Sequence, residues 1–173
     1  SADDSNEAAR LLKIIGDFER IADHAVNLVH SSEELQQKKM ELSAPALAEL
    51  KVLTNAVSEI LSLSLDAFLK DDLQSAVMVE PLEQVIDGLK EQLRTNHILR
   101  LQKEQCSIEA GFVWSDMLTD LERVSDHCSN IAGCIMDMHE GKLNLHESLR
   151  AMKEDREKFA ERYALYQEKY KLA

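Results

Sequence analysis

The sequence predicts an all-α protein, an up-and-down bundle of long helices. Two prolines and five glycines occur in 173 residues, so few positions would interrupt a helix. Apolar residues recur at steps of three and four, which is the period of an α-helix, and no strand-like alternation is present. A hydrophobic content of 45% is enough to build a core. We therefore expect residues 1–173 to form a single helical domain with antiparallel neighbouring helices.

Five segments share this helical period: residues 5–37, 43–69, 73–101, 107–140 and 145–170. Ser43 is a favourable N-cap for the second segment, and Pro45 is tolerated in its first turn. Pro81 lies inside the third segment, where it removes a backbone donor and should kink the helix near Val77. The fifth segment is heavily charged and has only a thin apolar stripe.

Charge and cysteine content exclude several classes of function. The net charge of −12 disfavours nucleic acid and anionic lipid as partners and is compatible with binding cations. Cys106, Cys128 and Cys134 form no CxxC pair, which indicates free thiols in a reducing compartment. No apolar run approaches the ~18 residues that span a bilayer, so we expect no membrane helix in these residues. A longer parent chain could still carry one upstream.

The most informative feature is an internal repeat. DFERIADHAVNL at residues 17–28 recurs as DLERVSDHCSNI at residues 120–131. The identical positions are all polar: Asp, Glu, Arg, Asp, His and Asn. Core packing alone would preserve the apolar positions and let the charges drift, so the repeat indicates chemistry at the polar residues.

The second copy carries two carboxylates one helical turn apart. Glu122 and Asp126 should lie on the side of the helix opposite its apolar face. Like charges at this spacing repel, but a hard cation that binds several oxygens could bridge them. The third segment offers Glu83 and Asp87 at the same spacing. We therefore predict that the four carboxylates converge on one metal site.

Other interpretations remain open from the residues alone. The acidic stripes could be solvated faces of a metal-free helical scaffold. A ferritin-like metal enzyme is disfavoured because such enzymes use ExxH motifs that face the bundle interior. His24 and His127 are better explained by hydrogen bonds within the bundle than by metal ligation. No Ser/His/Asp or Cys/His triad can be placed, so we expect no enzyme.

Both motifs resemble the two signature helices of PhoU-type domains, which are built from three-helix repeats. The neighbouring sequence is more specific. Residues 79–132, with HILRLQ, AGFVWSD and LERVSDHCSNIA in that order, resemble the PhoU-like C-terminal region of bacterial Na⁺/phosphate cotransporter-type membrane proteins. The resemblance extends over roughly residues 5–137.

This resemblance implies a cytosolic regulatory domain linked to phosphate uptake. It also implies multinuclear metal, such as iron, zinc, manganese or magnesium, held by paired E(D)xxxD motifs. By position, the ligands of one site would be Glu83, Asp87, Glu122 and Asp126, and those of the other would include Glu19 and Asp23.

The chain departs from the family pattern at its beginning. Residues 5–37 would be the last helix of a truncated first repeat, 43–140 a complete second repeat, and 144–171 an additional helix. We expect a fragment on the cytoplasmic side of a membrane transporter, with a free-standing PhoU-type adaptor as the alternative. Glu19 and Asp23 then lack a partner pair, so their site should be vacant or weak. The first helix should expose an apolar strip, to be covered by a homodimer or by the fifth helix.

Overall fold

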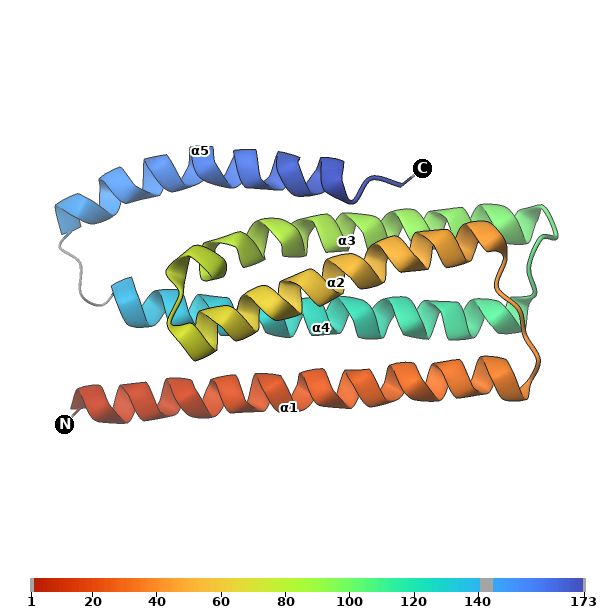
Figure 1. The fold of residues 1–173 in the computed structure, drawn as a ribbon, viewed down its shortest axis with the longest axis horizontal. Helices are drawn as coiled ribbons and strands as arrows, with labels where there is room; N and C mark the ends of the chain where they lie inside the picture. The colour runs from red at the N-terminus through yellow and green to blue at the C-terminus, as the bar shows by residue number, and fades with distance from the viewer. Residues whose placement is uncertain (1, 141–144, 173) are drawn as a thin grey trace.

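The computed structural model describes residues 2–140 and 145–172, which form long helices and no strand (Figure 1). The helices are α1 (Ala2–Gln37), α2 (Ala44–Lys70), α3 (Leu73–Gln102), α4 (Ile108–Glu140) and α5 (Leu145–Lys169). Consecutive helices run in opposite directions, so the predicted all-α, up-and-down fold is confirmed.

Local capping explains where α2 begins and ends. The Ser43 side chain accepts a hydrogen bond from the backbone N–H of Ala46, as the sequence predicts for an N-cap. Asp71 ends the helix in the left-handed conformation, with a φ of 53°. The Asp72 carboxylate then accepts the backbone N–H of Gln74 at 2.9 Å and starts α3.

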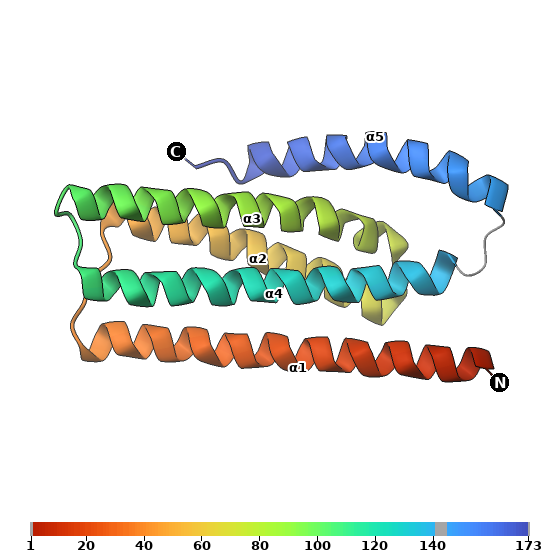
Figure 2. The same ribbon diagram turned by 180° about the vertical axis from the view of Figure 1, so that it is seen from behind.

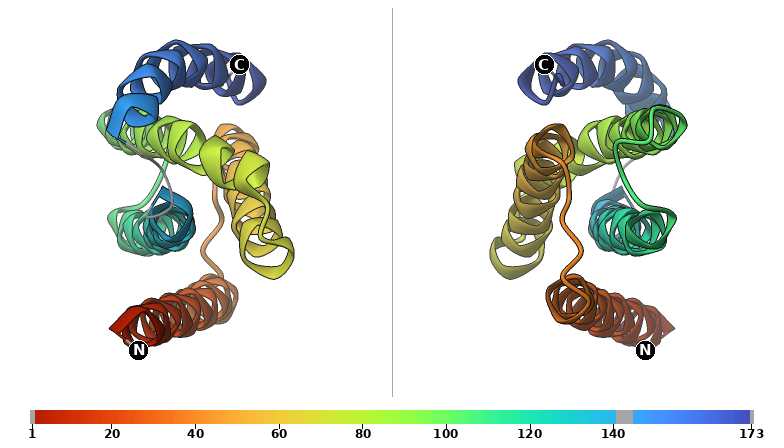
Figure 3. Two further views of the ribbon diagram at one scale, coloured as in Figure 1. Left: turned by 90° about the vertical axis from the view of Figure 1, so that its left-hand side faces the viewer. Right: turned by 90° about the vertical axis from the view of Figure 1, so that its right-hand side faces the viewer.

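Helices α2, α3 and α4 form a central three-helix unit, with α1 packed on α4 and α5 packed on α3. The end-on views in Figure 3 show this arrangement, with α1 and α5 on opposite sides of the central unit. The largest fully buried side chains include Trp114, Ile60, Leu82, Leu93 and Ile131. The N-terminal part of α3 bends, as predicted from the buried Pro81 within it (Figure 1).

The apolar character of α2 differs from the sequence expectation. Its length of 27 residues and mean hydropathy of 1.4 over a window would suffice to cross a membrane, by length and composition only. The expectation that no segment is long and apolar enough to span a bilayer is therefore wrong for α2. Packing explains part of this composition, because α2 contacts both α3 and α4 and buries Leu53, Val57 and Ile60, although only 33% of the window is buried.

One face of α1 carries an apolar strip that no other described helix covers. The strip consists of exposed large side chains: Leu11, Leu12, Ile15, Val26 and Val29. The exposed strip was expected, but the idea that the fifth helix covers it is wrong. Helix α5 packs on α3, where Tyr166 and Tyr170 are buried. The tyrosines of α5 therefore pack on the side of the bundle opposite α1.

Candidate metal centre

Three carboxylates from two helices meet on the outside of the central unit. Glu83 and Asp87 come from α3 and Asp126 comes from α4, and one oxygen of each lies within 4.8 Å of the others. The spacing of four residues places Glu83 and Asp87 one turn apart on the same face of α3. Because α4 lies antiparallel beside α3 (Figure 2), Asp126 reaches the same point. A cation that prefers oxygen ligands would fit this donor set.

Glu122, the fourth predicted ligand, lies next to this cluster but already has a partner. Its carboxylate forms an ion pair with Lys90 of α3, in which Lys90 Nζ lies 2.8 Å from Glu122 Oε2. Both side chains are four-fifths buried. The predicted set of four is therefore brought to one patch, with Glu83, Asp87 and Asp126 as its convergent members and Glu122 held by a lysine.

The cluster is electrostatically strained. Burial raises the pKa of Glu83 from 4.5 to about 7, and the negative charges of Asp87, Glu80, Asp126 and Glu122 add to the effect. The pKa values of Asp87 and Asp126 are also raised, first by burial and then by Glu122. Carboxylates brought this close repel one another, and an arginine 3.4 Å from Asp126 offsets this repulsion only in part, so a bound metal ion would relieve a cost that the fold imposes.

This cost predicts how stability depends on pH in the absence of metal. Because the pKa of Glu83 is higher in the folded protein, its ionisation destabilises the fold. The cost is absent below pH 4.5 and complete above about pH 7. After allowance for solvent screening, the free energy of unfolding should fall by about 1 kcal/mol over this window. Chemical denaturation of metal-free protein measures the slope. Glu83→Gln should flatten it, and an unchanged slope in that variant would contradict the assignment.

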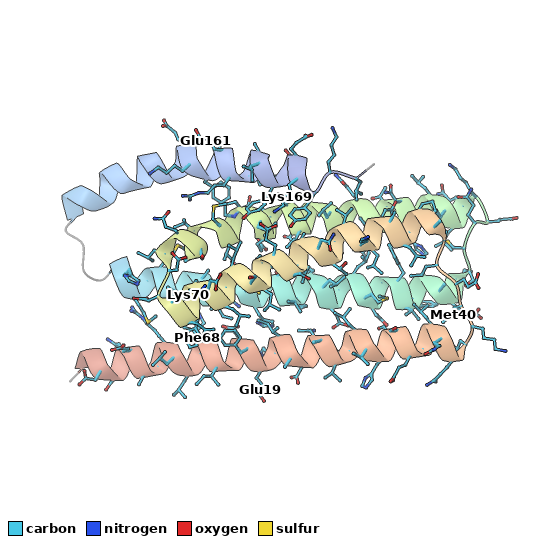
Figure 4. The ribbon with its side chains drawn as sticks, viewed as in Figure 1. Glu19, Met40, Phe68, Lys70, Glu161 and Lys169 are labelled. Carbon is cyan, nitrogen blue, oxygen red and sulfur yellow. The ribbon has the colours of Figure 1, made fainter. Side chains whose placement is uncertain are left out.

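The first copy of the motif does not assemble a comparable cluster. Glu19 and Asp23 are exposed on α1, and Figure 4 shows Glu19 pointing away from the bundle. Neither joins a group of potential ligands within the described residues. The structure thus brings together the predicted site of the second copy and leaves Glu19 and Asp23 apart from it.

Other identical residues of the repeat have a different role, which sequence reasoning missed. Asp120 of the second copy binds the first copy: its Oδ1 lies 2.7 Å from His24 Nδ1 and 3.2 Å from Asn27 Nδ2. In the reverse direction, Asp17 Oδ1 lies 2.8 Å from His127 Nδ1 and 3.3 Å from Asn130 Nδ2.

These two crossed pairs join α1 to α4 through equivalent residues. Since an ionised carboxylate only accepts, each histidine carries its proton on Nδ1. The His24 and His127 rings stack with their centroids 5.8 Å apart. Asp17 and Asp120 are both buried. The expectation that the histidines form hydrogen bonds within the bundle is confirmed. An aspartate occupies the same position in both copies of the repeat, and this was the sequence signal that could have revealed the role of Asp17 and Asp120.

Comparison with known proteins agrees with this geometry. The family model of the PhoU domain matches residues 50–135, which contain the carboxylate cluster. The chain contains a PhoU domain. The matched range runs from α2 into α4, so it corresponds to the central three-helix unit.

Proteins similar to this chain carry names from phosphate transport. It is 28% identical, over 82% of its length, to "Phosphate-specific transport system accessory protein PhoU homolog 1" of Thermotoga maritima, covering 60% of that protein. It is 29% identical, also over 82% of its own length, to "Phosphate-specific transport system accessory protein PhoU homolog" of Zymomonas mobilis, and it covers 58% of that protein. The chain thus spans about three-fifths of the length of these relatives. No solved structure was found to match it.

Proposed function

We propose that this protein acts as a PhoU-type accessory protein in phosphate transport. The PhoU domain at residues 50–135 carries the proposal, supported by relatives that are named as accessory proteins of a phosphate-specific transport system. These relatives favour a free-standing adaptor over the regulatory domain of a Na⁺/phosphate cotransporter-type protein. The role is regulatory contact with a transporter rather than catalysis.

Phosphate uptake in cells tests this proposal. Deleting the coding region in the source organism should change the rate of labelled phosphate uptake, and change how uptake responds to phosphate starvation. Re-expression of the protein should restore both. Unchanged uptake at high and low external phosphate would contradict the proposal. A sodium-dependent component that disappears with the deletion would instead favour the cotransporter interpretation.

We further propose that Glu83, Asp87 and Asp126 bind a divalent or trivalent metal ion, with Glu122 as an additional ligand once Lys90 is displaced. The supporting observation is the convergence of three carboxylates whose pKa values are raised by burial and by neighbouring carboxylates. Oxygen donors suit magnesium, manganese and iron, and zinc also accepts carboxylates. Glu19 and Asp23 would contribute only weakly, since they are exposed and isolated from the cluster.

We propose that the exposed strip of α1 mediates self-association into a homodimer. Leu12 and Ile15 are 69% and 57% exposed in its N-terminal part, and exposed apolar surface of this kind drives association. Sedimentation should show a dimer for the natural protein and a monomer for the Leu12→Glu, Ile15→Glu variant. As a matched control, Leu69→Glu changes an equally exposed leucine on α2 and should leave the dimer intact. A natural protein that sediments as a monomer would refute this.

A further inference from the structure

A largely buried ion pair lies beside the carboxylate cluster, about one helical turn further along both helices. Lys90 follows Asp87 by three residues on α3, and Glu122 precedes Asp126 by four residues on α4. These spacings place the pair on the same faces of α3 and α4 as the cluster. Lys90 Nζ lies 2.8 Å from Glu122 Oε2, and each side chain is only 19% exposed. The pair therefore borders the candidate metal centre directly.

The ammonium group of Lys90 occupies a carboxylate that a metal ion could otherwise use. It neutralises the charge of Glu122 and donates to one of its oxygens. Glu122 is accordingly absent from the group of carboxylates whose oxygens converge within 4.8 Å, although it lies one turn from Asp126 on the same helix. Lys90 thus withholds the fourth carboxylate from the cluster.

The positive charge of Lys90 also acts on the cluster itself. Burial raises the pKa values of Asp87 and Asp126, and Glu122 raises them further, whereas Lys90 acts in the opposite direction on both. Arg123 also acts on Asp126, but its side chain is 57% exposed, so water competes with it. A metal ion in the cluster would experience the charge of Lys90 as repulsion, in proportion to the charge of the ion.

Lys90 has room to leave Glu122. Its ammonium group is carried on a flexible four-carbon stem. The same residue lines a pocket of about 320 Å³ between α3 and α4. A displaced ammonium group could therefore stay hydrated while Glu122 turns toward a metal ion, without movement of either helix.

We propose that Lys90 is a resident cation that competes with metal ions for the cluster and disfavours a trivalent ion more than a divalent one. This role rests on the proposed metal site and sets which class of ion that site prefers. While Lys90 holds Glu122, a metal ion has only the carboxylates of Glu83, Asp87 and Asp126. Lys90 is therefore a specificity-determining residue and not a ligand.

Calorimetric titration of the metal-free protein with Mn²⁺ and with La³⁺ tests this role. Lys90→Met removes the charge and keeps an unbranched apolar stem. The variant should bind Mn²⁺ about tenfold and La³⁺ about thirtyfold more tightly than the natural protein, because the repulsion that is removed scales with ionic charge. Lys169→Met is the matched control: Lys169 pairs with Glu59 at 2.7 Å, outside the cluster, and its loss should leave both affinities unchanged.

A second variant tests whether the gain depends on Glu122. Lys90→Met with Glu122→Gln removes both members of the pair and keeps the net charge of the patch, so both ions should bind as they bind the natural protein. Urea denaturation gives a readout in the absence of metal. The midpoint of Lys90→Met should fall, because Glu122 is left largely buried without its cation, and Mn²⁺ should raise it again.

Three results would overturn the role of Lys90 while leaving the metal site intact. They are a Lys90→Met variant that binds Mn²⁺ no more tightly than the natural protein, an equal gain for Mn²⁺ and La³⁺, and a gain that persists in full when Glu122 is also replaced. Failure of both ions to bind the natural protein and Lys90→Met would instead refute the metal site, and the role of Lys90 with it. Far-UV circular dichroism confirms that each variant retains its helices.

Discussion

Replacing Asp120 by alanine is expected to destabilise the protein by about 2–4 kcal/mol. Asp120 is buried and accepts from both His24 and Asn27, so its loss leaves two donors without an acceptor between α1 and α4. Urea denaturation gives the free energy of unfolding directly. Asp17→Ala should have a similar effect, because Asp17 holds His127 and Asn130 in the same way.

A double-mutant cycle separates the pair from the general effect of mutation. Asp120→Ala combined with His24→Ala should be less destabilising than the sum of the two single changes, by about 1–3 kcal/mol. Glu19→Ala is the matched control: it removes an exposed carboxylate from the same repeat and should change stability by less than about 0.5 kcal/mol. Strict additivity of Asp120→Ala and His24→Ala would show that the crossed pair contributes nothing as a pair.

Addition of Mn²⁺, Zn²⁺ or Fe²⁺ is expected to raise the melting temperature by about 5 °C or more. A ligand that binds only the folded state contributes about 2.7 kcal/mol at a hundredfold excess over its Kd, and each kcal/mol corresponds to a few degrees at this chain length. The metal would neutralise Glu83, Asp87 and Asp126, whose mutual repulsion opposes folding. Differential scanning fluorimetry with and without a chelator measures the shift.

The variants make the response specific to the cluster. Asp87→Asn with Asp126→Asn should raise the stability of the metal-free protein, since two repelling charges are removed, and should abolish the response to metal. Glu19→Gln with Asp23→Asn carries the same chemical change on exposed residues of α1 and should respond as the natural protein does. Identical shifts in both double variants would exclude the cluster as the binding site.

Periodicity and capping were sufficient to predict the helices. Local signals set the limits of these long helices: the apolar residues at steps of three and four, the N-cap Ser43 and the turn at Asp71. The approach of Glu83, Asp87 and Asp126 was also predictable. A short connection makes α3 and α4 antiparallel neighbours, so the ExxxD motif of one helix can face that of the other. These features depend on helix geometry and on one connection between adjacent helices.

Which residues of α1 are buried against its neighbour could not be predicted. Helix α1 buries Ile14, Asp17 and Ile21 against α4 and leaves the larger apolar strip exposed. That choice depends on the crossed carboxylate–histidine pairs, which join residues far apart in sequence. The pairing of Glu122 with Lys90 likewise depends on the relative position of α3 and α4 along their axes. Both belong to tertiary packing rather than to local pattern.

The contact between α1 and α4 has the form of an isologous interface, in which each side offers the other the same aspartate, histidine and asparagine. Such an interface is complementary to itself. A duplicated ancestral segment would therefore have met its own copy ready to bind, and fusion of the two copies required no new contact. The same reciprocity restrains later change, since an exchange at one aspartate or histidine is balanced only by a matching exchange in the other half.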